Sequence, residues 1–198
     1  MDGTRMETAV DPIALFRVWM EDAEARESDD PSAMALATAT RDGMPSVRMV
    51  LMKQVDERGF CFYTNAESQK GLELAENPRA AMCFHWKSLR RQVRIAGTVT
   101  ELPAAEADDY FHSRSRLSQL GAVASQQSRV LASRELLVAL VKELEEEFPG
   151  EIPRPDYWQG YVLRPERIEF WMNREGRLHD RFSFSRSGEE WRKERLFP

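Results

Sequence analysis

Two spacing patterns of apolar residues divide this chain, and the change between them falls near residue 31. In the amino-terminal part, apolar residues recur at roughly helical spacing: Ile13, Leu15, Phe16, Trp19 and Met20. Asp11 and Pro12 precede this run and suit the start of a helix. The pattern predicts a first helix that ends near Arg26, after a flexible segment of residues 1–10.

From residue 33 onward, short runs typical of strands are separated by turn residues. The predicted strands cover residues 33–40, 46–55, 60–64, 80–86, 92–102, 157–163, 167–172 and 181–185. Asp and Gly occupy the turns at 41–43 and 56–59, as they do in many hairpins. We therefore expect antiparallel neighbours, with a carboxy-terminal strand and tail over residues 187–198.

Helical spacing returns in three places between the strands: residues 68–76, 103–112 and 133–148. Asn77 and Pro78 are well suited to end the first of these helices. Because the helices do not alternate regularly with the strands, we expect an α+β fold, an antiparallel β-barrel with flanking helices. A chain of 198 residues can bury one sizeable core, so a single domain over residues 1–198 is the expected organisation.

Composition excludes several classes of protein. The net charge of −5 argues against a general nucleic-acid binder, whose surface is usually basic. Cys61 and Cys83 have no metal-binding or redox spacing, which favours two free thiols in a reducing compartment. No apolar run is long enough to span a membrane, and the amino terminus lacks the apolar core of a signal peptide. We therefore expect a cytoplasmic protein.

The usual motifs of phosphate loops, nucleophiles and metal sites are absent from the sequence. The glycines are all isolated, which excludes both the dinucleotide-binding and the P-loop patterns. His85, His112 and His179 are far apart and have no cysteine at ligand spacing, so we expect no metal site. Any chemistry here should therefore come from a bound organic cofactor that the protein orients.

Cations stand at both ends of an apolar strand, Arg48 at its start and Lys53 at its end. Because side chains alternate along a strand, these two residues should point to opposite faces and meet two different anions. Lys70 adds a third cation in the first turn of a predicted helix, where backbone N–H groups favour phosphate. The alternative is an edge strand whose cationic tips simply reach water.

Three further segments combine cations with hydroxyl or amide groups. In a helix, Tyr110, Arg114 and Ser118 would lie on one face and suit an oxyanion, although a solvated helix face is equally compatible. The run 125–128 offers uncharged donors, or an ordinary polar loop. Finally, Arg177, His179 and Arg181 would alternate onto one side of a strand or turn near Trp171, or form a hairpin with charged edges.

Together these segments closely resemble the pyridoxamine 5′-phosphate oxidase family, flavin-dependent enzymes with a split-barrel fold. The resemblance runs from about residue 12 to residue 198. It rests on the order and spacing of short motifs at residues 48–53, 62–65, 91–93, 110–114, 127–128, 168–171, 177–181 and 195–198. Each motif is weak alone, but their combination is specific.

The resemblance implies a homodimer that holds FMN at the subunit interface, with Arg48, Lys70 and Ser128 on the FMN phosphate. The residues implied around the cofactor are Arg48, Met49, Val50, Leu51, Met52, Lys53, Tyr63, Thr64, Gln69, Lys70, Gln92, Gln127, Ser128, Trp171 and Arg181. The residues implied at the substrate are Lys53, Tyr110, Arg114 and Ser118 on its phosphate, and Arg177 and His179, the implied catalytic pair, over its pyridine ring.

The implied reaction is oxidation of pyridoxamine or pyridoxine 5′-phosphate to pyridoxal 5′-phosphate, with a hydride passing to flavin N5 and dioxygen then yielding hydrogen peroxide. Three positions depart from the family's pattern: Gln69 replaces a common Arg, Ser115 a usual Pro and Leu117 a frequent acidic residue. The family's Arg- and Tyr-bearing segment before the first helix is also not recognisable. The alternatives are an oxidase of another, phenazine-type substrate and a non-catalytic protein that binds FMN or pyridoxal phosphate.

Overall fold

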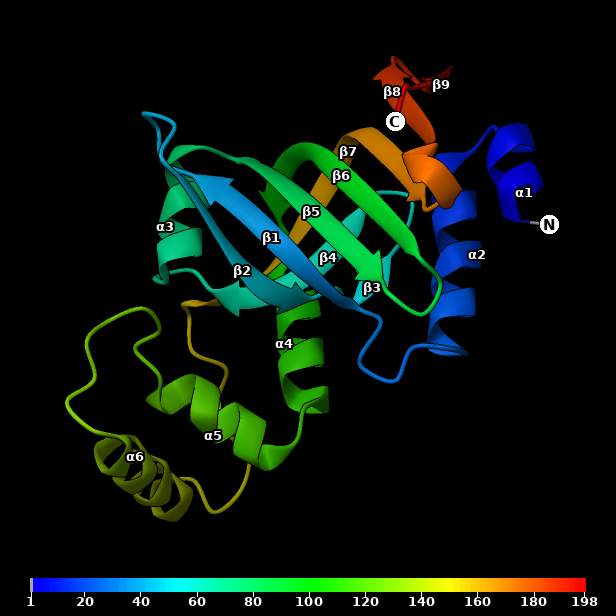
Figure 1. The fold of residues 1–198 in the computed structure, drawn as a ribbon. Coiled ribbons are helices and arrows are strands. Elements are labelled where there is room, and N and C mark those ends of the chain that lie inside the picture. Colours follow the sequence, from blue (N-terminus) through cyan, green and yellow to red (C-terminus); the bar gives the residue numbers. More distant parts are fainter. Residues whose placement is uncertain (1) are drawn as a thin grey trace.

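One antiparallel sheet organises the part of the chain that the structure describes (Figure 1). The structure is a computed structural model, and it describes residues 2–198, with the side chains of residues 4–198. The strands are β1 (Ala33–Ala39), β2 (Pro45–Leu51), β3 (Gln54–Val55), β4 (Phe60–Asn65), β5 (Arg79–Trp86), β6 (Arg91–Glu101), β7 (Trp158–Met172), β8 (Asp180–Ser187) and β9 (Glu190–Arg195). The helices are α1 (Asp2–Thr8), α2 (Pro12–Glu24), α3 (Gln69–Glu76), α4 (Ala104–Ser113), α5 (Arg116–Ala124) and α6 (Arg134–Glu147), with a 3-10 turn η1 (Glu175–Arg177).

The long strand β7 gives the sheet its split shape. The strand order is β2-β1-β5-β6-β7-β4-β3, and β8 and β9 continue from β7 outside this path. β7 pairs with β6 along most of its length, with β4 through its first part and with β8 through its last part. The first half of β7 thus closes a barrel, while its second half carries an extension.

Helix α2 fills the barrel with aromatic side chains. Phe16 packs edge-on against Phe60 and Trp19 edge-on against Phe170, with ring centroids 4.9 and 5.1 Å apart. Both α2 rings are fully buried. The helix begins as the sequence predicts, because Asp11 accepts a hydrogen bond from the Ile13 N–H and Pro12 occupies the first turn.

A second, smaller apolar cluster lies beside the barrel. It joins α4 and α5 to the start of β7, and its buried members are Ala107, Phe111, Leu120, Ile152 and Trp158. Figure 1 places α4, α5 and α6 together on one side of the sheet. This cluster fixes the helices that carry the second group of predicted site residues.

The amino- and carboxy-terminal segments are joined to each other. The Lys193 ammonium on β9 donates to the carbonyl oxygens of Met6, Glu7 and Ala9, at 2.7, 2.5 and 2.9 Å. Arg195 pairs with the Glu7 carboxylate at 2.8 Å. Met6 is fully buried, so α1 is packed on the β8–β9 extension rather than standing apart.

The α+β split-barrel prediction is confirmed, with several local corrections. The predicted strand 46–55 is two strands, because β2 ends at Leu51 and β3 begins at Gln54. The predicted strands 157–163 and 167–172 are one strand, β7, which bends at a register shift opposite residues 96 and 97. Residues 2–8, for which we expected no element, form α1.

Two groups of predicted site residues also have a different local structure. Tyr110, Arg114 and Ser118 do not lie on one helix, because the backbone of Arg114 is extended and separates α4 from α5. Arg177 ends the 3-10 turn with a φ of 62°, and β8 begins only at Asp180, so strand alternation does not apply to Arg177 and His179.

Candidate active site

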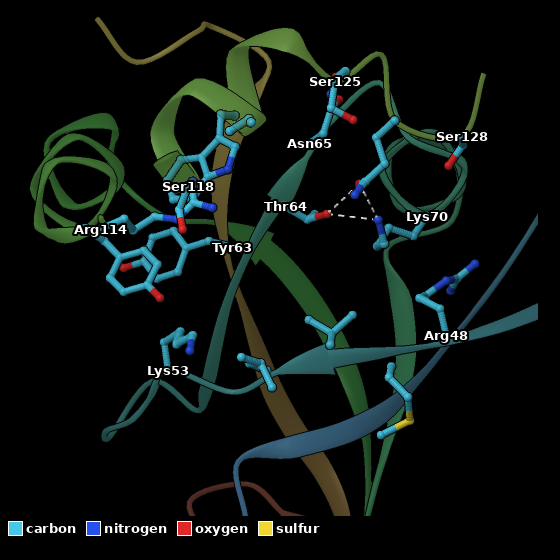
Figure 2. Close-up of a pocket in the computed structure, with 18 of the residues that line it drawn as sticks. Arg48, Lys53, Tyr63, Thr64, Asn65, Lys70, Arg114, Ser118, Ser125 and Ser128 are labelled. Atoms are coloured by element: carbon cyan, nitrogen blue, oxygen red, sulfur yellow. Dashed lines mark hydrogen bonds between the residues drawn. The ribbon is translucent and has the colours of Figure 1, made fainter. Parts of the chain in front are cut away.

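A cavity of about 1030 Å³ lies between β2, β4 and the helices α3, α4 and α5. Figure 2 shows cations at its two ends. Fourteen of the predicted site residues line it: Arg48, Met49, Val50, Leu51, Lys53, Tyr63, Thr64, Gln69, Lys70, Tyr110, Arg114, Ser118, Gln127 and Ser128. This volume lies at the upper end of the range for small-molecule sites.

We call Arg48, Thr64, Lys70, Gln127 and Ser128 the Lys70 end of the cavity. The Lys70 ammonium, 7% exposed, donates to Thr64 Oγ1, Ser68 Oγ and Gln127 Oε1 at 2.9, 3.0 and 2.8 Å. Burial lowers the pKa of Lys70 to about 8, and the Arg48 charge acts in the same direction. Ser68 caps the start of α3, so the N-terminus of this helix also faces this end.

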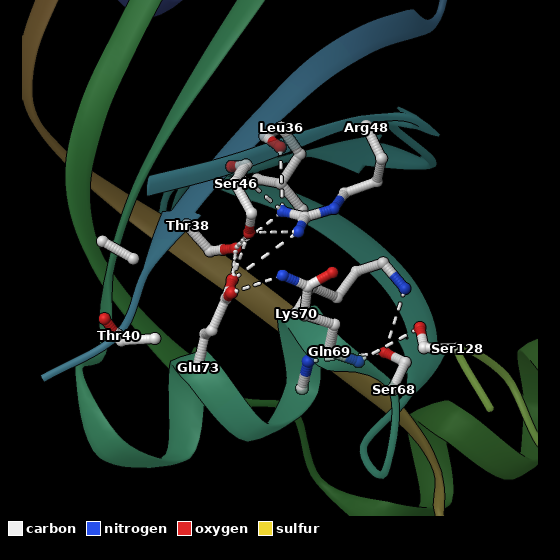
Figure 3. A network of polar contacts seen from close by, with 12 residues as sticks. Leu36, Thr38, Thr40, Ser46, Arg48, Ser68, Gln69, Lys70, Glu73 and Ser128 are labelled. Carbon is white, nitrogen blue, oxygen red and sulfur yellow. Dashed lines mark hydrogen bonds and ion pairs between the residues drawn. The ribbon is translucent and has the colours of Figure 1, made fainter. Parts of the chain in front are cut away.

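The Arg48 guanidinium is fixed by a polar network with the buried Glu73 (Figure 3). Its Nη1 donates to Thr38 Oγ1 and its Nη2 to Ser46 Oγ, at 2.6 and 2.5 Å. Both hydroxyls in turn donate to the Glu73 carboxylate, which lies 3.6 Å from Arg48 Nη2 and also accepts from Gln69 Nε2 at 3.0 Å.

The Glu73 carboxylate remains ionised within this network. Burial would by itself raise the pKa of Glu73, but hydrogen bonds from Ser46, Thr38 and Gln69, together with the Arg48 charge, hold it below its usual value. The Lys70 end thus contains two cations and one anion of fixed position.

We call Lys53, Tyr110, Arg114, Ser115 and Ser118 the Arg114 end. The hydroxyls of Ser115 and Ser118 lie 2.8 Å apart at the start of α5, where Ser115 is the N-cap. Arg114 Nη1 is buried, and among the described atoms it has no hydrogen-bond partner. A buried donor without a partner is costly, so its presence in a cavity points to an anionic ligand.

Aromatic rings connect the two ends. Tyr63 stacks on Tyr110 and on Trp158, with centroids 4.1 and 5.4 Å apart. Gly160 on β7 lies beside Tyr63, and a Cβ at this position would stand 2.7 Å from Tyr63 Cε1. The missing side chain at Gly160 therefore lets the Tyr63 ring lie flat against β7.

The other predicted site residues form a separate group, which we call the sheet-face cluster: Gln92, Trp171, Arg177, His179 and Arg181. Gln92, Trp171 and Arg181 are direct neighbours across β6, β7 and β8. The His179 ring lies 4.6 Å from the Trp171 ring, and Arg181 donates twice to the buried Glu169 at 2.9 and 2.8 Å. None of these five residues lines the cavity described above.

The strand geometry explains this separation. Trp171 lies eleven positions beyond Gly160 on β7, which is up to about 36 Å of strand at about 3.3 Å per residue. Met52 also does not line the cavity, because its side chain is buried in the barrel core. The prediction of opposite faces for Arg48 and Lys53 is wrong: both line the cavity, at its two ends, because β2 ends before Lys53.

Sequence reasoning missed several residues of the cavity and its supports, among them Thr38, Ser46, Glu73 and Trp158. Glu73 had a usable signal, since it lies four residues after Gln69 on one helix face. Thr38 and Trp158 had none, because only strand register brings them to the site. Within the described residues, no group of three potential metal ligands occurs and no helix has the length and apolarity to cross a membrane.

Comparison with known proteins decides the family. Residues 20–147 match the family model described as pyridoxamine 5′-phosphate oxidase, and residues 158–198 match the model of the pyridoxine 5′-phosphate oxidase C-terminal dimerisation region. The chain belongs to the pyridoxamine 5′-phosphate oxidase family. The dimerisation region contains four of the five residues of the sheet-face cluster.

Curated relatives agree over nearly the whole chain. A pyridoxine/pyridoxamine 5′-phosphate oxidase of Gluconobacter oxydans is 56% identical over 98% of this chain and 97% of its own length. A pyridoxine/pyridoxamine 5′-phosphate oxidase from Erythrobacter litoralis is 55% identical over 95% of this chain and 91% of its own length. The predictions of the family and of an oxidoreductase are therefore confirmed.

Solved structures support the fold. PhzG from Burkholderia lata, solved in complex with tetrahydrophenazine-1-carboxylic acid, is 34% identical and superimposes with a TM-score of 0.92, over 98% of this chain and 96% of that one. A pyridoxamine 5′-phosphate oxidase-related protein from Nostoc punctiforme, 18% identical over 96% of this chain and all of its own, has a TM-score of 0.76 and is similar in fold.

Proposed function

We propose that this chain is an FMN-dependent oxidase of pyridoxamine and pyridoxine 5′-phosphate, with the FMN phosphate at the Lys70 end and the substrate phosphate at the Arg114 end. The observation that carries this proposal is the presence of two separate cationic ends in one cavity. A cofactor and a substrate that each bear a phosphate require two such ends. The names of the relatives agree with this substrate class.

The donors at the Lys70 end fit a phosphate dianion. Lys70 and Arg48 supply charge, Ser128 supplies a hydroxyl, and the start of α3 supplies backbone N–H groups. Tyr63, Thr64, Gln69 and the β2 segment would border the rest of the FMN. A bound FMN would supply the redox chemistry: an acceptor for the hydride from C4′ of the substrate, with dioxygen as the final acceptor of the two electrons and two protons that make hydrogen peroxide.

The residues at the Arg114 end would bind and orient the substrate. The unpartnered Arg114 Nη1 and the Lys53 ammonium would meet its phosphate, with the hydroxyls of Tyr110 and Ser118 beside it. This is positioning rather than acid–base chemistry, and it suits a reaction that depends on the alignment of two partners.

The sheet-face cluster would complete the site from the second subunit. Val47, Met49 and Leu51 of β2 line the cavity. Across the sheet, Met49 pairs with Ala35, Ala35 with Cys83 and Cys83 with Arg94, so these β2 residues lie on the same face of the sheet as the sheet-face cluster. Val47 and Met49 on this face are 68% and 65% exposed. An exposed apolar face that continues into a cavity is typical of an interface. In a two-fold dimer, it would bring His179 and Arg177 of one subunit to the cavity of the other.

The proposed function is tested by peroxide production with each phosphorylated vitamer and its dephosphorylated form. We expect Arg114→Ala to raise KM for pyridoxamine 5′-phosphate by about thirtyfold, because it removes a charged hydrogen-bond donor. FMN binding should stay unchanged, and Arg134→Ala, at the exposed start of α6, is the matched control. Equal rates with and without the substrate phosphate would contradict the proposal.

The PhzG ligand carries a carboxylate and no phosphate, so faster oxidation of such a compound would favour the phenazine-type alternative.

The shared site is tested by co-expression of two variants with separate defects, Lys70→Met in one copy and His179→Ala in the other, assayed at an FMN concentration that saturates the wild type but leaves the Lys70→Met cavity empty. If each cavity takes its sheet-face cluster from the partner, random pairing gives one intact site in every mixed dimer and about a quarter of the wild-type activity. If each site were built within one chain, the mixture would stay inactive.

A further inference from the structure

The Arg114 guanidinium rests on aromatic rings. Its Cζ lies 5.0 Å from the centroid of Trp158 and 5.9 Å from that of Phe111. Among the side chains that the structure describes, those of residues 4–198, no carboxylate is paired with it. This support differs from that of Arg48, whose donors are taken up by hydroxyls and carbonyls and whose charge faces Glu73.

Trp158 is itself held in one orientation. Its side chain is 6% exposed, and it packs edge-on against Phe111 with centroids 5.2 Å apart. It is also stacked with Tyr63 at an interplanar angle of 11°. A buried ring held by two other rings presents a fixed surface to the nearby cation.

The backbone of Arg114 is fixed as well. It is extended between α4 and α5, and the buried Gln119 amide donates to the carbonyl oxygens of Arg114 and His112 at 2.9 and 3.3 Å. The backbone bonds and the aromatic rings thus hold the side chain at both of its ends. The hydrogen-bond donors of the guanidinium are left for a ligand.

We propose that Trp158 is the positioning residue that holds the Arg114 guanidinium for the substrate phosphate. An aromatic face attracts a cation without occupying its N–H donors, whereas a carboxylate in the same place would occupy them and repel a phosphate. Trp158 thereby sets the preference for phosphorylated over dephosphorylated ligands. This inference rests on the proposed substrate site.

The experiment compares three variants of the FMN-loaded protein. Trp158→Leu removes the aromatic face and keeps apolar bulk, and Trp158→Phe restores a smaller face. Trp191→Leu is the matched control, because Trp191 also lies under a guanidinium, that of Arg186 at 5.4 Å, on the distant β9. Each protein is titrated with pyridoxal 5′-phosphate and with pyridoxal, and its flavin content is checked by absorbance.

We expect Trp158→Leu to weaken binding of pyridoxal 5′-phosphate by roughly tenfold, the size of a desolvated cation–π contact, with pyridoxal binding unchanged. Trp158→Phe should recover most of this loss, and Trp191→Leu should match the wild type. In peroxide kinetics, Trp158→Leu should raise KM for the phosphorylated substrate and leave kcat within about twofold of the wild-type value.

Two results would overturn the inference: an equal loss for both ligands in Trp158→Leu, or no loss for either. Trp158→Met gives the same readout should the leucine variant not fold. A wild-type protein that binds pyridoxal as tightly as its phosphate would instead overturn the proposed substrate site, so the two failures are distinguishable.

Discussion

The two ends of the cavity hold their cations by different physical means. At the Lys70 end, Lys70 and Arg48 are hydrogen bonded to side-chain oxygens of the protein, and Glu73 balances part of their charge. At the Arg114 end, the guanidinium lies on aromatic rings and keeps a donor without a partner. A polar network makes a site sensitive to charge and pH, whereas an aromatic support makes it sensitive to ring contacts.

The largest expected difference between the ends comes from Lys70→Met. The change removes a charge from the FMN phosphate and leaves Thr64, Ser68 and Gln127 without their shared donor. We expect FMN to bind about a hundredfold more weakly, as charged hydrogen bonds of this kind predict. The measurement is titration of the apoprotein by quenching of flavin fluorescence.

The matched control for this change is Lys142→Met on the exposed face of α6. At saturating FMN, the preference of Lys70→Met for phosphorylated over dephosphorylated substrate should equal that of the wild type. If Lys70→Met abolished that preference and left FMN binding intact, the assignment of the two ends would be reversed.

The next difference is in pH dependence. Because the pKa of Lys70 is lowered to about 8, mainly by burial, its charged form is complete only below that pH in the unliganded protein. A bound phosphate dianion favours the charged form and raises this pKa. FMN affinity should therefore fall about twofold between pH 7 and pH 8 and about tenfold by pH 9.

The substrate end should not share this fall, since Arg114 keeps its charge over the same range. The measurement is the FMN dissociation constant between pH 7 and 9.5, compared with that of pyridoxal 5′-phosphate at saturating FMN. In Lys70→Met the fall of FMN affinity above pH 8 should vanish.

The same lowered pKa means that the unliganded fold loses stability as pH falls from 10.5 to about 8, where the unfolded chain binds the proton more readily.

The smallest expected effect comes from Gln69→Arg. Gln69 is exposed at the start of α3, its N–H donates to Ser128 Oγ at 3.2 Å, and its amide donates to Glu73. An added cation here should tighten FMN about threefold, because exposed charges are screened. Gln69→Glu is the control of opposite sign and should weaken FMN by a similar factor. A change in substrate affinity with none in FMN affinity would contradict the assignment.

Hairpins, most helices and the strands of the barrel follow from local sequence, because turn residues and apolar spacing act over a few positions. The break at Arg114 does not, since Tyr110 to Ser118 also fits a continuous helix and only Ser115 hints at a new N-cap. Helix α1 also escaped prediction, because Met6 is the one fully buried side chain among its described residues 4–8.

The candidate site was predictable where cations recur at family spacing and unpredictable where tertiary contacts decide. Arg48, Lys70 and Arg114 were found from their motifs. Glu73 and Trp158 support two of these cations. The helical spacing from Gln69 places Glu73 on the right helix face, but its contact with Arg48 depends on strand and helix packing, and the contact of Trp158 with Arg114 has no local signal at all.

The contacts of Lys193 with residues 6–9 have a consequence for chain connectivity. They bring the first helix and the last strand of the described chain into contact. Because these two terminal segments lie close together, a short linker could join them without disturbing the fold. A circularly permuted chain could have its ends joined here and be reopened at the exposed turn 41–43. It would keep every strand pairing of the barrel and would lose only the covalent connection between β1 and β2.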